Sequence, residues 1–291
     1  MNIKIILLIS LILIKESYPN AEYKKNLISI SPIQIKPIEK EIIKEENDEE
    51  IENQMKNYLK TYVKSTKEKQ NKLKDKIKKS FTKHIDRLIK NKINLDKYKY
   101  TNINDNDSDY YLTLLQIAAL IGSENDAKNL LSLGLNPNIK NDKLNTPLHY
   151  ATSSKIAEML IKKGANTTSK NYFGNTPLHQ ASRYENFEII EILLSNNVPI
   201  NISNFVDRIP LCLAIESGNL EICKTLIEKG SNINSNKNST KQTPLHLAIM
   251  ILEKDIINLL IENGADINLK NIYGYAPIDL INEISQLQDV L

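Results

Sequence analysis

Glycine is absent from the first 121 residues, although the 291-residue chain contains eight glycines in all. Glycine is one of the strongest markers of turns, so its absence indicates that this first part contains few tight turns. From Gly122 to Gly274 the glycines recur along the chain. The composition therefore divides the chain into a glycine-free arm and a region that glycines interrupt repeatedly.

The chain also lacks the short motifs that mark common catalytic sites. It contains no glycine-rich phosphate loop, zinc-protease helix, nucleophile elbow or kinase signature. We therefore interpret the protein as a non-enzyme, and we expect it to bind neither a cofactor nor a metal ion.

The net charge of +3 conceals two segments of opposite charge. Eight acidic residues lie between Glu39 and Glu52, and sixteen Lys or Arg residues lie between Lys56 and Lys99. A lysine-rich helix usually presents these residues as a solvated face. A basic amphipathic helix also suits an anionic surface, either a membrane or a nucleic acid. Nucleic acid is the less favoured of these, because stacking aromatics are not interleaved and no DNA-reading motif is present.

Residues 1–21 have the features of an export signal. Lys4 precedes an apolar run from Ile5 to Ile14, which has the length of a signal-peptide core and is too short to span a bilayer as a helix. We predict an exported protein, periplasmic or secreted. The alternatives are a membrane protein anchored by an uncleaved N-terminus, or a buried strand.

The segment 22–38 contains two prolines and is predicted to be a linker. Residues 39–108 then form a charged arm rich in helix-forming residues. Apolar residues at helical spacing predict helices in this arm, in a first stripe and a second: Ile51, Met55, Tyr58 and Tyr62, then Leu73, Ile77, Phe81, Ile85, Leu88 and Ile89.

A six-residue phrase returns through the remainder of the chain. Its clearest copy is Thr-Pro-Leu-His-Gln-Ala, beginning at Thr176. Close or degenerate copies begin at Thr113, Thr146, Ile209, Thr243 and Ala276, a period near 33 residues. This phrase at this period resembles the ankyrin-repeat family, with about six repeats over residues 109–291.

The resemblance implies an all-α repeat solenoid in which each repeat is a helix, a turn, a second helix and a finger loop. Thr and Pro would start the first helix of each repeat, because the hydroxyl caps free N–H groups and proline suits the first helical position. Residues 84–94 resemble the second helix at 255–266, so the last basic helix of the arm is predicted to cap the stack. Thr101–Asp109 would be an enlarged finger loop.

The resemblance gives the repeated polar residues a structural role, with the histidines bonding within and between repeats. The residues to which we assign this role are Thr146, Pro147, His149, Thr176, Pro177, His179, Thr243, Pro244 and His246. His84 stands apart on a basic helix and is predicted to be solvated. Cys212 and Cys223 are expected to be buried free thiols, with a disulfide between them as the alternative.

Three departures from the repeat affect local geometry. The second copy is three residues short, so Ser153–Lys155 must replace most of the inter-helix turn and the end of the first helix. Asn197 stands where a closing glycine belongs, and Asn is the best substitute there. Three residues replace a finger glycine, and we expect those fingers to be less regular: Leu144, Asp207 and Lys241.

In ankyrin repeats partners usually bind the concave face, which finger tips and first helices form. The positions that this assigns to partner binding are Tyr172, Phe173, Arg183, Tyr184, Phe205, Met250 and Ile251. We therefore predict a monomeric, non-catalytic module that binds another protein. The alternative is a peripheral scaffold that the basic helices at 56–99 tether to an anionic membrane or nucleic acid, and a third reading gives the arm only a capping role.

Overall fold

The computed structural model describes residues 67–92, 94–95, 99–101 and 111–288. The predicted export signal, the linker and the first apolar stripe of the arm lie outside the described residues. The chain divides into two compact units, residues 1–165 and 166–291, and each is considered by itself.

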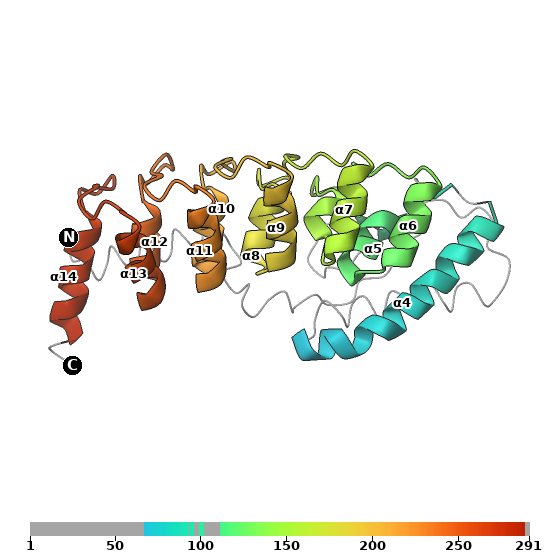
Figure 1. Ribbon diagram of the computed structural model, residues 1–291, viewed down its shortest axis with the longest axis horizontal. Coiled ribbons are helices and arrows are strands. Elements are labelled where there is room, and N and C mark those ends of the chain that lie inside the picture. The colour runs from blue at the N-terminus through green and yellow to red at the C-terminus, as the bar shows by residue number, and fades with distance from the viewer. Residues whose placement is uncertain (1–66, 93, 96–98, 102–110, 289–291) are drawn as a thin grey trace. The chain divides into compact units, whose positions relative to one another are not determined.

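In its described residues the first unit contains one long helix, several short helices and a small strand pair (Figure 1). Its elements are α4 (Lys67–Lys90), β1 (Lys99–Thr101), β2 (Tyr111–Thr113), α5 (Leu114–Ile121), α6 (Glu124–Ser132), the 3₁₀ helix η1 (Pro147–Tyr150) and α7 (Ser154–Lys162). The strands pair antiparallel, with Lys99 opposite Thr113. They flank the predicted finger loop, most of which lies outside the described residues.

Helix α4 packs against α5 through its apolar stripe. Ile77, Phe81 and Ile85 are fully buried, and the Thr82 hydroxyl donates a 2.9 Å hydrogen bond to the Asp126 carboxylate on α6. His84 is buried as well, so its predicted solvation is wrong. It follows Phe81 by three residues and precedes Leu88 by four, which places it on the buried face of the helix.

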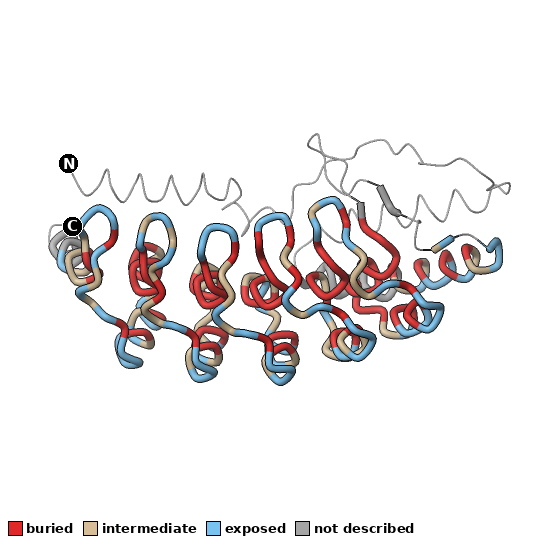
Figure 2. Tube along the Cα trace, turned by 90° about the horizontal axis from the view of Figure 1, so that it is seen from above, coloured by how far each residue is buried: buried red, intermediate tan, exposed pale blue. Residues whose placement is uncertain are grey.

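The second unit contains three helix pairs and a final helix (Figure 1). These are α8 (Pro177–Arg183) with α9 (Phe187–Ser195), α10 (Pro210–Ser217) with α11 (Leu220–Glu228), α12 (Pro244–Met250) with α13 (Lys254–Glu262), and α14 (Pro277–Gln288). The first helices stack in the order α8, α10, α12, α14. Figure 2 shows that most of the buried residues lie in the helices and that exposed residues prevail in the turns at their ends. The all-helical repeat stack is therefore confirmed.

The repeated phrase starts the first helices as predicted. The Thr176 hydroxyl accepts a hydrogen bond from the His179 backbone N–H, and Pro177 takes the first helical position. Thr243 and Pro244 do the same for α12. In the short second copy the first helix shrinks to the 3₁₀ turn η1, which leaves three residues before α7 begins at Ser154.

The finger turns are regular, contrary to the expectation for the fingers without glycine. Leu144, Asp207 and Lys241 adopt φ values of 57°, 55° and 51°, the left-handed conformation that Gly174 and Gly274 also have. An asparagine side chain closes the turn: in the glycine-free finger 204–208, Asn204 Oδ1 accepts from the backbone N–H groups of Val206 and Arg208. The Asn204 side chain therefore stabilises the turn, although Asp207, the fourth residue of the finger 204–208, is strained by its left-handed conformation. Asn197 also has a positive φ, 56°, as predicted.

Candidate protein-binding surface

The histidine of the repeated phrase, where it is present, is part of the scaffold and is buried: His149, His179 and His246. The backbone N–H of Thr176 lies 3.1 Å from His179 Nδ1, which must therefore accept. His179 Nε2 then carries the proton and donates to the Arg208 carbonyl, 3.0 Å away at the base of the next finger. His246 makes the same two contacts, with Thr243 and with the Tyr275 carbonyl. The predicted role within and between repeats is thus seen for these two histidines.

The buried position of His179 sets its protonation state. Burial lowers its pKa to about 4, because a charged imidazolium would lose its hydration, and the Arg208 carbonyl opposes this only in part. Protonation would also place a hydrogen on Nδ1, which already faces the Thr176 N–H. His179 is therefore neutral near pH 7, in one tautomer.

Gln116 replaces the histidine in the first repeat and keeps both of its contacts, a role that the sequence analysis did not assign. Its Oε1 accepts from the Thr113 backbone N–H at 3.0 Å, and its Nε2 donates to the Asn145 carbonyl at 2.8 Å. Asn145 precedes the next repeat's capping residue, as Arg208 and Tyr275 do. An amide can therefore substitute for the imidazole here, and a Gln three residues after a capping Thr is the signal for it.

Cys212 and Cys223 are buried free thiols, as predicted. Burial raises the pKa of Cys223 to about 12, with a further contribution from the neighbouring Cys212, and burial raises the pKa of Cys212 as well. Thiols held in the protonated form are poor nucleophiles. In the part of the chain that the structure describes, no group of His, Cys, Asp and Glu side chains has the arrangement of a metal site, and no helix is long and apolar enough to cross a membrane.

Two neighbouring finger tips of the second unit each present two exposed apolar side chains, and the other exposed apolar residues of this unit are more widely spread: Tyr184, Phe187, Leu252, Ile261, Ile272 and Tyr273. We call these residues the finger patch: Tyr172, Phe173, Phe205 and Val206. Phe205 is 66% exposed, Tyr172 63% and Phe173 50%. Three of the seven residues predicted to bind a partner are therefore exposed at adjacent positions, and Val206 extends them.

Contacts between the two fingers hold the patch in place. The Phe205 backbone N–H donates to the Phe173 carbonyl at 3.2 Å, and the Tyr172 and Phe173 rings meet edge to face with centroids 5.5 Å apart. The Phe205 ring lies against Gly174, where a Cβ atom would be 2.6 Å from ring Cγ. Lys170 Nζ lies 5.5 Å from the same ring centroid and donates to the Ser203 carbonyl.

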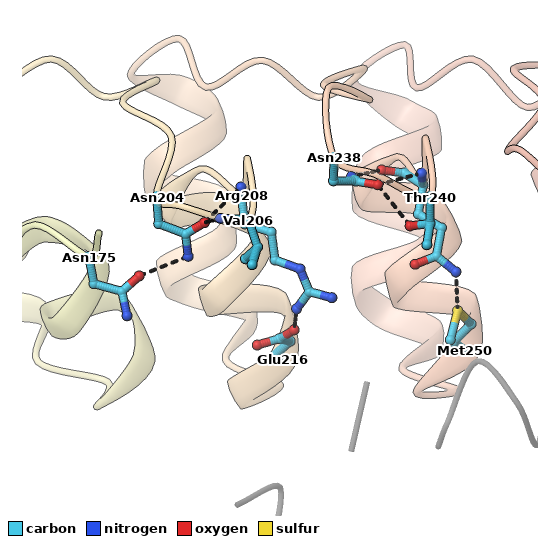
Figure 3. A network of polar contacts seen from close by, with 9 residues as sticks. Asn175, Asn204, Val206, Arg208, Glu216, Asn238, Thr240 and Met250 are labelled. Carbon is cyan, nitrogen blue, oxygen red and sulfur yellow. Dashed lines mark hydrogen bonds and ion pairs between the residues drawn. The ribbon is translucent and has the colours of Figure 1, made fainter. Parts of the chain in front are cut away.

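The other predicted binding residues do not belong to the patch. Arg183 ends α8 and Tyr184 follows it, about 10 Å along the helix from its start, half-exposed and exposed respectively. Ile251 is half-buried at the end of α12. Met250 is only 8% exposed, so its prediction as a contact residue is wrong. Its sulfur lies 3.2 Å from Gln242 Nε2 of the preceding finger, which covers it (Figure 3).

The first-helix surface also contains an ion pair that was not predicted from the sequence. Arg208, at the base of a finger, pairs through its guanidinium with Glu216 near the end of α10 (Figure 3). Both side chains are largely buried. Arg208 and Glu216 occupy the positions that Gln242 and Met250 take one repeat later, so a finger-base residue covers the end of the first helix in both repeats. A finger-base Arg eight residues before a Glu was the available signal.

Comparison with known proteins agrees with this arrangement. A model of the family described as ankyrin repeats (3 copies) matches residues 77–171, 115–204 and 203–271. The chain is 32% identical over 108 residues to alpha-latrotoxin-Lg1a of Latrodectus geometricus, which covers 36% of this chain and 8% of the toxin. It is 30% identical over 106 residues to the putative ankyrin repeat protein FPV024 of Fowlpox virus (strain NVSL), covering 36% of this chain and 18% of the viral protein. The matched region thus spans a small part of each relative. The family match starts at Ile77, within α4, and runs through most of the chain, so this protein belongs to the ankyrin-repeat family.

Proposed function

We propose that the protein is a non-catalytic binding module whose finger patch captures a protein partner. Ankyrin repeats are typically protein-interaction modules, and a model of this family is what matches the chain. We place the binding at Tyr172, Phe173, Phe205 and Val206 because of the exposure and the contacts of these residues.

The observation that carries the proposal is the exposure of Phe205 despite its contacts. Its ring packs against Gly174 and beneath the Lys170 ammonium, yet two-thirds of the residue remains exposed. Packing between fingers therefore orients the ring without burying it. An aromatic side chain that is already oriented loses little conformational entropy when it binds, and aromatic residues are enriched in interface centres.

The surrounding residues limit the chemistry of the partner. The patch offers three aromatic rings and a valine, so the partner should bring apolar side chains to the finger tips. Arg183 at the end of α8 is half-exposed, so it would meet polar groups of the partner, whereas the equivalent Glu216 on α10 is largely buried in its ion pair with Arg208. We further propose, from the N-terminal sequence alone, that this binding takes place outside the cytoplasm, and that the array acts as a monomer.

The test is capture of protein partners from the source cells by the immobilised full chain. The variant Phe173→Ala/Phe205→Ala should lose the captured partner by at least tenfold, because both rings leave the patch. The matched control is Phe187→Ala/Leu252→Ala, which removes exposed apolar side chains away from the finger tips. Circular dichroism would establish that both variants are folded. Equal capture by the two variants would exclude the finger patch as the binding site.

A further inference from the structure

Helix α4 carries a continuous row of cations along one face. Lys and Arg recur at steps of three and four residues through the helix, at Lys69, Lys72, Lys76, Lys79, Lys83, Arg87 and Lys90. With 3.6 residues per turn, this spacing places all seven positions within about 80° around the helix and about 32 Å along it. We call these seven residues the cationic row.

The cationic row lies opposite the face by which α4 joins the repeats. Ile77, Phe81 and Ile85 are fully buried against the first repeat, half a turn of the helix away from the row. Where the structure describes side chains of α4, Lys79, Lys83 and Lys90 are exposed and Arg87 is half-exposed. Lys78, which is outside the row, lies near the carboxylates of Glu124 and Asp126 on α6 and lowers their pKa values, although burial leaves that of Asp126 raised overall.

Pairing within the helix accounts for part of the row only. Glu68, Asp75 and Asp86 each precede a lysine of the row by four residues, the spacing of a favourable helical pair. These three acids stand against seven cations, and they occupy one flank of the row. The row therefore keeps an excess of positive charge. Solubility alone does not account for this excess, because uncharged polar residues would also keep this face of the helix solvated.

We propose that the cationic row docks α4 on an anionic phospholipid bilayer, with the helix axis parallel to the membrane plane. A flat surface touches a helix along one line, and the acidic positions lie about 60–80° around the helix from the centre of the row, so they are farther from the lipid phosphates than the cations are. A nucleic-acid groove surrounds a helix on several sides and would bring phosphates against Glu68, Asp75 and Asp86. Single-stranded nucleic acid is favoured by exposed aromatic residues, and among the described side chains of α4 the one aromatic ring, Phe81, is buried.

Docking of this kind is electrostatic and does not insert the helix. The apolar face of α4 is occupied by the first repeat, and no large apolar side chain is exposed in the described part of α4. Each Lys or Arg close to an anionic bilayer strengthens binding by about fivefold, and this attraction falls off within a Debye length. Because the buried face and the row are opposite, α5 and α6 are held on the side of α4 away from the lipid.

The experiment measures co-sedimentation of the full chain with vesicles of phosphatidylcholine containing about 30% phosphatidylserine. At low salt the protein should bind these vesicles and should not bind vesicles of phosphatidylcholine alone. The variant Lys79→Gln/Lys83→Gln/Lys90→Gln should bind about a hundredfold more weakly, because three close cations are removed. All three side chains are exposed, so the thermal unfolding midpoint should stay unchanged.

The matched control is Lys128→Gln/Lys162→Gln/Lys163→Gln, which removes the same charge from exposed positions on and next to α6 and α7. It should reduce vesicle binding by less than threefold. Equal losses in the two variants would overturn the proposal, because net charge alone would then explain binding. Absence of vesicle binding by the wild-type chain, or tighter binding to duplex DNA or heparin than to the vesicles at equal ionic strength, would also overturn it.

Discussion

Replacement of Gly174 by alanine is expected to lower the free energy of unfolding by about 3 kcal/mol, whereas Gly274→Ala should lower it by about 1 kcal/mol. Both glycines occupy the same position in their fingers, with φ values of 75° and 83°. An alanine in this conformation carries a strain of about 1 kcal/mol at either site. The remaining difference comes from the neighbouring finger.

The neighbouring finger approaches only one of the two glycines. A Cβ atom on residue 174 would overlap the Phe205 backbone nitrogen and its ring, whereas a Cβ atom on residue 274 meets nothing within 4 Å. The first substitution therefore has to push the finger 204–208 away and break the hydrogen bond from the Phe205 N–H to the Phe173 carbonyl. Since a backbone atom is among those displaced, rotation of the ring alone gives no relief.

Urea unfolding of the two full-length variants, followed by circular dichroism, measures this difference. Equal losses of stability would mean that the two fingers do not pack as described. The same pair also tests the finger patch, because Gly174→Ala should weaken partner capture by displacing Phe205, and Gly274→Ala should leave capture unchanged.

Acidification is expected to destabilise the protein through His179, and His179→Gln should remove that part of the pH dependence. The pKa of this histidine is about 4 in the folded chain and about 6.5 in the unfolded chain. The unfolded state therefore binds more protons between these values, so stability is complete above pH 6.5 and is lost as the pH falls toward 4. Between pH 7 and pH 5 the expected loss is about 2 kcal/mol from this residue.

Glutamine is the matched replacement because Gln116 already makes both contacts in the first repeat. At pH 7 the variant should differ from the wild type by less than about 1 kcal/mol. Other titrations act on both proteins alike, including Asp126, whose raised pKa has the opposite effect on stability. Free energies of unfolding at pH 7 and pH 5 for the two proteins give the comparison. Parallel pH dependence in the two would show that His179 titrates normally and that its buried contacts do not form.

The repeat architecture could be predicted from the sequence because the repeated six-residue phrase contains most of the residues that start and bury the first helix. In Thr176-Pro177-Leu178-His179, the first two residues start the helix and the next two are fully buried. The repeat period then predicts where the remaining helices lie along the chain. The short second copy was predicted less well: Ser154 and Lys155 were expected in the inter-helix turn but belong to α7, because the first helix shortens to a 3₁₀ turn instead.

The candidate site was less predictable because exposure depends on neighbours that the period does not identify. Met250 and Arg183 occupy equivalent positions, but Gln242 covers Met250 whereas Arg183 stays half-exposed. His84 lies in a lysine-rich sequence and is buried, because its position on α4 faces the first repeat. The repeat period thus identifies the positions that form the surface. The finger residue that packs against each position then decides whether its side chain remains exposed.

The central claim is that a protein partner binds at the finger tips, and site-specific photo-cross-linking tests it most directly. A benzophenone side chain would replace Phe205 in one variant and Leu252, which is also exposed, in another. On irradiation in the source cells, position 205 should give a discrete protein adduct that Phe173→Ala suppresses, and position 252 should give none. An adduct of equal yield at position 252, or none at position 205, would contradict binding at the finger patch.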